Sequence, residues 1–126
     1  MATVLIVEDE AAVLILAESV IQHAGHETLT ASSLVEATSI IESDAILDIV
    51  FTDLRLHDEQ DGGIQIGALL RSRRPDLPVL YTSGREMTDG LRLLLGETSD
   101  FLPKPYTDIQ ATDALARLLK GVRTDA

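Results

Sequence analysis

The chain has 126 residues, which fits one domain over residues 1–126, and its 21 acidic and 10 basic residues give a formal net charge of −11. The acidic excess disfavours direct binding to nucleic acid, which depends on neutralising phosphates, and the lack of cysteine excludes disulfides, thiolate metal sites and a cysteine nucleophile. The chain does not open with a cationic segment and a long apolar run, so we expect no signal peptide, no membrane span and a cytoplasmic location.

Short apolar runs alternate along the chain with apolar residues at helical spacing. Each run is typical of a buried strand, and each helical pattern follows one of them. The expected strands are residues 4–7, 27–31, 47–54, 78–82 and 100–102. The expected helices are residues 13–24, 33–42, 63–74, 86–94 and 107–121.

Capping residues support the ends of several predicted helices. Ser33 with Glu36, and Thr107 with Gln110, have the spacing of a capping box, which begins a helix. Gly25 stands where the first helix is expected to end, because glycine readily adopts the left-handed conformation found there. The sequence therefore predicts five strand-helix units.

Strict alternation of strands and helices predicts an α/β fold. Strands that are apolar on both faces indicate a parallel sheet covered by helices on each side. For five units the common doubly wound order is 2-1-3-4-5, the flavodoxin-like arrangement, here with five helices. In this order the first, third, fourth and fifth strands adjoin, so the residues that follow them meet at one edge of the sheet.

The residues that follow these four strands are polar: Glu8 and Asp9, then Asp53, Ser83 and Lys104. Asp53 alone has an ordinary alternative, the start of a turn, but its predicted neighbours favour a site. Carboxylates at about 4 Å repel by roughly 4 kcal/mol per pair at an effective dielectric of 20, so the cluster requires a cation. Hard oxygen donors without nearby histidine or cysteine favour Mg²⁺.

Asp53 is the candidate nucleophile of this cluster. Carboxylates accept phosphoryl groups as aspartyl phosphates when a metal offsets the incoming negative charge. The ammonium of Lys104 and the hydroxyl of Ser83 suit the oxygens of a transferring phosphoryl group. The sequence thus predicts Mg²⁺-dependent phosphoryl transfer to Asp53.

The whole chain resembles the receiver domain of two-component response regulators. The resemblance rests on four segments in the family's order and approximate spacing: Leu5-Ile6-Val7-Glu8-Asp9-Glu10, Asp53 at a strand end, Thr82-Ser83-Gly84, and Lys104-Pro105.

This resemblance implies a role for each site residue. Asp53 would be the phosphoacceptor, and Ser83 and Lys104 would bind the phosphoryl oxygens. The metal ligands would be Asp9, Asp53, Glu8 through a water molecule, and the backbone carbonyl of Arg55. Phe101 stands at the place of the family's switch aromatic, which responds together with Ser83.

Three positions depart from the family's usual pattern. Ser83 stands where threonine is commoner, which keeps the hydroxyl but loses a methyl group that restricts its rotamer. His57 stands where many receivers have proline, and Gly62 comes one place later than the usual glycine. We therefore expect the loop after Asp53 to be one residue longer than usual.

The leading functional hypothesis is a stand-alone phosphoacceptor switch. A histidine kinase or histidine phosphotransfer protein would donate the phosphoryl group, and a downstream protein would bind the product. Only five residues follow Gly121, so we expect no output domain. The face after the fourth strand is the candidate for a homodimer interface.

Two alternatives stay open from the sequence. An aspartyl-nucleophile phosphohydrolase would usually carry a second acid two residues after the nucleophile, where this chain has Arg55. An unphosphorylated receiver-like interaction module would not need the acceptor residues. We therefore expect a protein that catalyses only its own phosphorylation and dephosphorylation, rather than an enzyme acting on other substrates.

Overall fold

The computed structural model describes residues 2–56, 62–84, 93 and 99–121. In chain order its elements are β1 (Thr3–Val7), α1 (Ala11–His23), β2 (Glu27–Ala31), α2 (Leu34–Glu42), β3 (Ile49–Asp53), α3 (Gly62–Arg73), β4 (Val79–Ser83), β5 (Ser99–Pro103) and α5 (Asp108–Leu119). The helix expected at residues 86–94 lies, apart from Leu93, outside the described residues, as do His57 and the loop expected to be longer.

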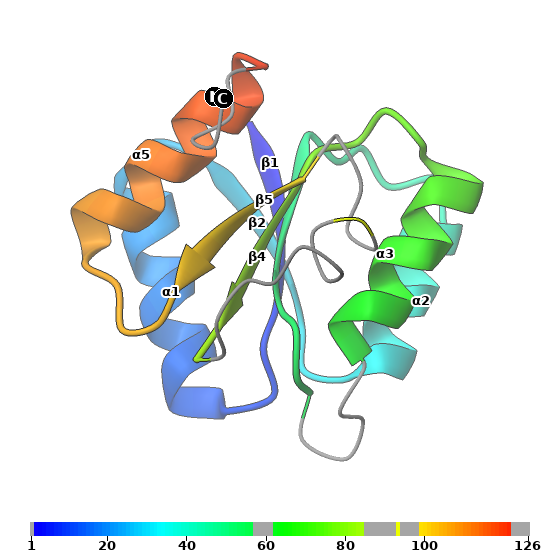
Figure 1. Ribbon diagram of the computed structural model, residues 1–126, viewed down its shortest axis with the longest axis horizontal. Coiled ribbons are helices and arrows are strands. Elements are labelled where there is room, and N and C mark those ends of the chain that lie inside the picture. The colour runs from blue at the N-terminus through cyan, green and yellow to red at the C-terminus, as the bar shows by residue number, and fades with distance from the viewer. Residues whose placement is uncertain (1, 57–61, 85–92, 94–98, 122–126) are drawn as a thin grey trace.

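The five strands form one parallel sheet in the order β2-β1-β3-β4-β5. Helices α1 and α5 cover one face, and α2 and α3 cover the other (Figure 1). The predicted doubly wound fold and strand order are therefore confirmed, with four of the five expected helices within the described residues. None of these helices is long and apolar enough to cross a membrane.

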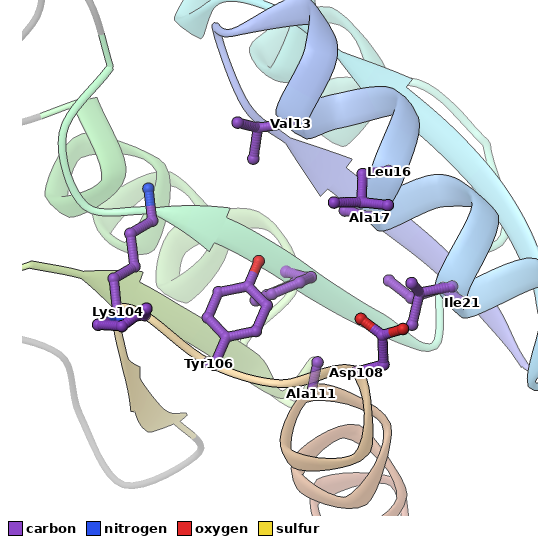
Figure 2. Close-up of a pocket in the computed structure, with 11 residues that line it drawn as sticks. Val13, Leu16, Ala17, Ile21, Lys104, Tyr106, Asp108 and Ala111 are labelled. Atoms are coloured by element: carbon purple, nitrogen blue, oxygen red, sulfur yellow. The ribbon is translucent and has the colours of Figure 1, made fainter.

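Two apolar clusters fill the space on either side of the sheet. The cluster under α2 and α3 includes Leu5, Val50 and Tyr81, and the cluster under α1 and α5 includes Ile6, Phe51 and Leu115. All five residues of β3 are buried, as expected for the central strand of a covered parallel sheet. The side beneath α1 is less closed, because a cavity of about 490 Å³ lies between α1 and the start of α5 (Figure 2).

The capping predictions are confirmed at α5 and half confirmed at α2. At α5 the Thr107 side chain accepts from the Gln110 amide, and the Gln110 side chain accepts from the Thr107 amide. At α2 the Ser33 hydroxyl accepts from the Glu36 amide at 3.1 Å. The Glu36 carboxylate instead accepts from the backbone and hydroxyl of Ser32, at 2.6 and 2.8 Å. The Glu36 carboxylate therefore caps the amide of Ser32, one residue before Ser33, the predicted partner.

The C-terminal end of α2 is held by Arg74, which directly follows α3. The Arg74 guanidinium donates hydrogen bonds to the carbonyls of Ile41, Ala45 and Ser43 at 3.1, 2.7 and 2.8 Å. Carbonyls at a helix C-terminus lack partners within the helix, and α2 has no basic residue in its own last turn. Arg74 thus plays the part that a C-terminal cap would otherwise play.

We expect Arg74→Lys to lower the free energy of unfolding by about 1–3 kcal/mol, because one ammonium cannot reproduce three hydrogen bonds in this fixed geometry. Arg73→Lys is the matched control, since Arg73 pairs with Glu42 within the described part of the chain, in an exposed ion pair at 3.3 Å, and the substitution should change stability by less than about 1 kcal/mol. Chemical denaturation measures both. Equal effects of the two substitutions would contradict this role of Arg74.

Tyr81 is completely buried on β4, beneath α3. Its hydroxyl has no hydrogen-bond partner among the described residues and lies against Gly67 of α3. Burial raises the pKa of Tyr81 to about 12, although the charge of Arg71 opposes part of this shift. The folded chain therefore keeps the phenol proton at pH values where an unfolded chain has lost it.

This difference makes stability depend on alkaline pH. The contribution of Tyr81 is fully present below its ordinary pKa of 10.0 and is lost as the pH rises through about 12. We expect the free energy of unfolding of the wild type to fall relative to that of Tyr81→Phe over this range, on the order of 1.4 kcal/mol per pKa unit. Urea unfolding at a series of pH values measures the difference, and parallel pH profiles would refute it.

Candidate functional site

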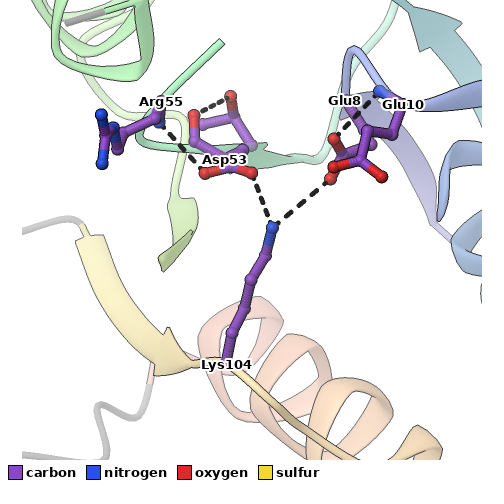
Figure 3. Close-up of polar contacts among 6 residues, drawn as sticks. Glu8, Glu10, Asp53, Arg55 and Lys104 are labelled. Atoms are coloured by element: carbon purple, nitrogen blue, oxygen red, sulfur yellow. Dashed lines mark hydrogen bonds and ion pairs between the residues drawn. The ribbon is translucent and has the colours of Figure 1, made fainter. Parts of the chain in front are cut away.

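Asp53 ends the central strand β3 at the carboxyl edge of the sheet. Its side chain is nearly buried, with 10% of its surface exposed. One carboxylate oxygen, Oδ1, accepts a hydrogen bond from the Arg55 amide at 3.0 Å, and the other, Oδ2, accepts one from the Lys104 ammonium at 2.7 Å (Figure 3). The hydrogen bond from the Arg55 amide is typical of a turn that begins at Asp53, which is the ordinary alternative to a functional site. The bond to Lys104 joins residues 51 positions apart, and a local turn does not account for it.

Lys104 follows β5 and connects two carboxylates across the edge. Its ammonium nitrogen lies 2.7 Å from Asp53 Oδ2 and 3.7 Å from Glu8 Oε1. Its backbone amide donates to the Ser83 carbonyl at 2.9 Å, which fixes the start of the side chain beside β4. Burial lowers the pKa of Lys104, but the hydrogen bond and charge of Asp53 and the charge of Glu8 outweigh it, so the net shift is upward. Lys104 is therefore a permanent cation at neutral pH.

Glu8 is a buried carboxyl group, only 5% exposed, at the end of β1. Burial is the main reason that its pKa rises to about 7, and the charge of Asp53 and a hydrogen bond with the Asp9 side chain act in the same direction. The Glu10 amide, which donates to Glu8 Oε2 at 3.2 Å, and the charge of Lys104 act against this rise. Glu8 thus changes its charge near neutral pH.

The structure also places the remaining predicted site residues. Asp9 is partly exposed beside Glu8, and Ser83 is buried as the last residue of β4. Arg55 is exposed directly beyond Asp53. Phe101 lies on β5, paired with Tyr81 and packed at the margin of the cluster beneath α2 and α3. Glu8, Asp53 and Lys104 are in direct contact, whereas the parts assigned to Ser83, Arg55 and Phe101 in binding or switching stay predictions.

The donor chemistry at this edge suits a hard divalent cation. Glu8, Asp9 and Asp53 supply carboxylate oxygens, the ligands that Mg²⁺ prefers. In the part of the chain that is described, these acids do not form a ready three-ligand metal group, and the Lys104 ammonium lies between Asp53 and Glu8. The three carboxylates therefore suit Mg²⁺ by their chemistry. The Lys104 ammonium offsets part of the negative charge of Glu8 and Asp53.

The sequence interpretation missed Gly63, which packs directly against the backbone of Asp53 and Leu54. The Gly63 amide donates to the Leu54 carbonyl at 3.0 Å, and a Cβ atom at Gly63 would collide with the backbone of Asp53 and Leu54. The start of α3 can approach the acceptor strand this closely only without a side chain. Two successive glycines at the start of a predicted helix were the available signal, because glycine is unfavourable there without such a reason.

Comparison with known proteins agrees with this geometry. Residues 4–116 match the family of response regulator receiver domains. The sensor kinase CckA of Brucella abortus is 34% identical over 121 residues, which cover 94% of this chain and 13% of that protein. The alginate biosynthesis transcriptional regulatory protein AlgB of Pseudomonas aeruginosa is 28% identical over 118 residues, which cover 93% of this chain and 26% of that protein. The chain therefore spans about a quarter or less of the length of these relatives.

Solved structures show the same relationship. A response regulator receiver protein from Sinorhizobium medicae superposes with a TM-score of 0.84 at 32% identity, covering 94% of each chain. The receiver domain of the hybrid histidine kinase CckA superposes with a TM-score of 0.76 at 27% identity, covering 93% of this chain and 98% of that one. These matches do not favour a phosphohydrolase. The chain belongs to the response regulator receiver domains of two-component systems.

Proposed function

We propose that Asp53 accepts a phosphoryl group from a phosphohistidine of a histidine kinase or histidine phosphotransfer protein, and that the modified domain then binds a downstream protein. One observation carries this proposal. The Asp53 carboxylate is held by Lys104 at 2.7 Å and by the Arg55 amide at 3.0 Å, at an edge of the sheet where a donor can approach. A rigidly held carboxylate beside a fixed cation suits attack on phosphorus.

The transfer forms one bond and breaks another. A carboxylate oxygen of Asp53 attacks phosphorus, the P–N bond to the donor imidazole breaks, and the imidazole leaves with the electron pair and takes up a proton. The Lys104 ammonium then pairs with an oxygen of the phosphoryl group, and the Ser83 hydroxyl donates to another. When bound, Mg²⁺ would be held by Asp9, Asp53, the Arg55 carbonyl and, through water, Glu8, and would offset the incoming charge.

Phosphorylation would also change the surface that a partner contacts. The charge at Asp53 goes from one negative to about two, with new acceptor oxygens. Ser83 would move towards them, and Phe101 would turn into the space that Ser83 leaves, altering the face that includes β5 and α5. Homodimerisation, the lack of nucleic-acid binding and a cytoplasmic location stay predictions from the sequence.

Labelling with a small acyl phosphate tests the acceptor chemistry without a cognate kinase. We expect intact mass to increase by one phosphoryl group when acetyl phosphate and Mg²⁺ are present, and not when a chelator replaces the metal. Amide chemical shifts recorded with a phosphoryl mimic test the switch separately. Labelling without metal would refute the proposed role of Mg²⁺. Unchanged amide shifts of Phe101 and Tyr106 would refute the switch, but they would not affect the proposal that Asp53 is the acceptor.

A further inference from the structure

Three polar side chains lie in one row across the sheet. Asp53 of β3 pairs with Thr82 of β4. The pairing of Val7 with Thr52 places Glu8, the next residue after β1, beside Asp53. On all three strands the residue two positions earlier belongs to the cluster under α1 and α5, so the row lies on that face of the sheet. Neighbouring strands are roughly 4.8 Å apart, which brings two carboxyl groups and one hydroxyl group close together.

Thr82 is the member of this row whose polar group is unpaired. Its side chain belongs to a residue that is only 3% exposed, and its Oγ1 has no hydrogen-bond partner among the described residues. The hydroxyl of Thr52, by contrast, donates to the Asp53 carbonyl at 3.0 Å. Buried polar groups nearly always have a partner, either in the protein or in an ordered water molecule. The Thr82 hydroxyl therefore points to a bound group beside it.

A hollow of about 10 Å³ lies next to the row. Glu8, Asp53 and Thr82 line it, and apolar or aromatic side chains lie around them, including Val13, Ala17 and Tyr106. Lys104 is not part of this lining, so the hollow meets the two carboxylates from a different side than the ammonium does. A space of this size holds about one water molecule, which needs two to four polar partners. The row supplies three.

We propose that Thr82 is a positioning residue whose hydroxyl holds one internal water molecule against the carboxyl groups of Glu8 and Asp53. The water accepts a hydrogen bond from the hydroxyl and donates one to each carboxylate. The Arg55 amide and the Lys104 ammonium already hold the two oxygens of Asp53, and the water adds a third fixed donor. A carboxylate held in one orientation reacts faster. This effect on rate rests on the proposed function of Asp53, whereas the water site itself does not.

Thr82→Val distinguishes a held water from an unpaired hydroxyl, because valine has nearly the same shape without the oxygen. Removing an unpaired buried hydroxyl would raise stability, whereas removing a partner of a bound water should lower the urea midpoint. Tyr81→Phe is the matched control, since the Tyr81 hydroxyl also has no partner among the described residues but does not line the hollow. It should not lower the midpoint at neutral pH. A midpoint of Thr82→Val at or above that of the wild type would overturn the proposal.

A high-resolution crystal structure locates the water directly. In the wild type and in Thr82→Ser, which keeps the hydroxyl, we expect one water within hydrogen-bond distance of the hydroxyl oxygen and of a carboxylate oxygen of Glu8 or Asp53. Thr82→Val should lack this water. A wild-type structure without it, or a valine variant that retains it, would refute the site.

Initial rates of labelling by acetyl phosphate at saturating Mg²⁺ test the positioning role. Thr82→Val should be about fivefold slower than the wild type, the typical contribution of one hydrogen bond, and Thr82→Ser should stay within about twofold. Tyr81→Phe should label at the wild-type rate. Equal rates for the valine and serine variants would refute the positioning role. If the wild type takes no label, the acceptor function fails, and the density beside Thr82 still decides the water site.

Discussion

Asp53→Asn is expected to reduce phosphoryl incorporation from acetyl phosphate below detection. An amide has no anionic oxygen to attack phosphorus, and it carries no charge to pair with the Lys104 ammonium, which lies 2.7 Å from Asp53 Oδ2 in the wild type. The amide keeps the size of the carboxylate and can still accept the hydrogen bond from Arg55. The fold should therefore survive, and intact mass spectrometry of the folded variant measures the loss.

Asp48→Asn is the matched control for this substitution. Asp48 is exposed just before β3, and its carboxylate accepts a hydrogen bond from the Thr3 amide at 2.7 Å, at the opposite end of the strand from Asp53. We expect this variant to incorporate one phosphoryl group as the wild type does. Label that persists in Asp53→Asn, or that disappears equally in both variants, would remove Asp53 from its proposed role.

Gly67→Ala is expected to lower the free energy of unfolding by about 1–2 kcal/mol. A Cβ atom at Gly67 would collide with the Tyr81 hydroxyl, which is fully buried. Overpacking of this kind typically costs about 1–3 kcal/mol, and here it outweighs the roughly 1 kcal/mol that alanine gains over glycine within a helix. Gly84→Ala is the control, because a Cβ there meets no atom of the described residues within 4 Å.

Removing the Tyr81 hydroxyl should reverse most of this loss. In a Tyr81→Phe background the atom nearest to the new methyl group is gone, and the ring carbon Cζ, at 3.3 Å, needs to shift only slightly. We therefore expect Gly67→Ala to be close to neutral there, with a coupling energy of about 1–2 kcal/mol from a double-mutant cycle. Additive effects in denaturant unfolding would show that another contact limits position 67.

Most of the fold was predictable because its signals are local. The strand at residues 27–31 has the bounds that the sequence predicts, and the pair Thr107 and Gln110 begins α5 through contacts three residues apart. The meeting of Glu8, Asp53 and Lys104 also followed from the sequence, because parallel strands in the predicted order bring their carboxyl ends to one edge.

The features that escaped prediction depend on distances that no local pattern records. The raised pKa of Glu8 follows from the depth at which its side chain lies, and the sequence does not state that depth. The spacing of Val13, Leu16 and Ala17 predicts an apolar side of α1, but it does not say whether α5 closes over that side. Likewise, the Glu36 carboxylate can reach the amide of either serine before the helix, and only the backbone geometry selects Ser32.

The attachment of Arg74 to α2 has a consequence for how these helices tolerate sequence change. The three groups that accept its hydrogen bonds, at Ile41, Ser43 and Ala45, are backbone carbonyls, which every amino acid carries. Substitutions at Ile41, Ser43 or Ala45 therefore leave the acceptors of these hydrogen bonds in place, whereas one substitution at position 74 removes all three bonds together. Mutational sensitivity at this junction is concentrated on Arg74, directly after α3, and the side chains at the end of α2 remain free to vary.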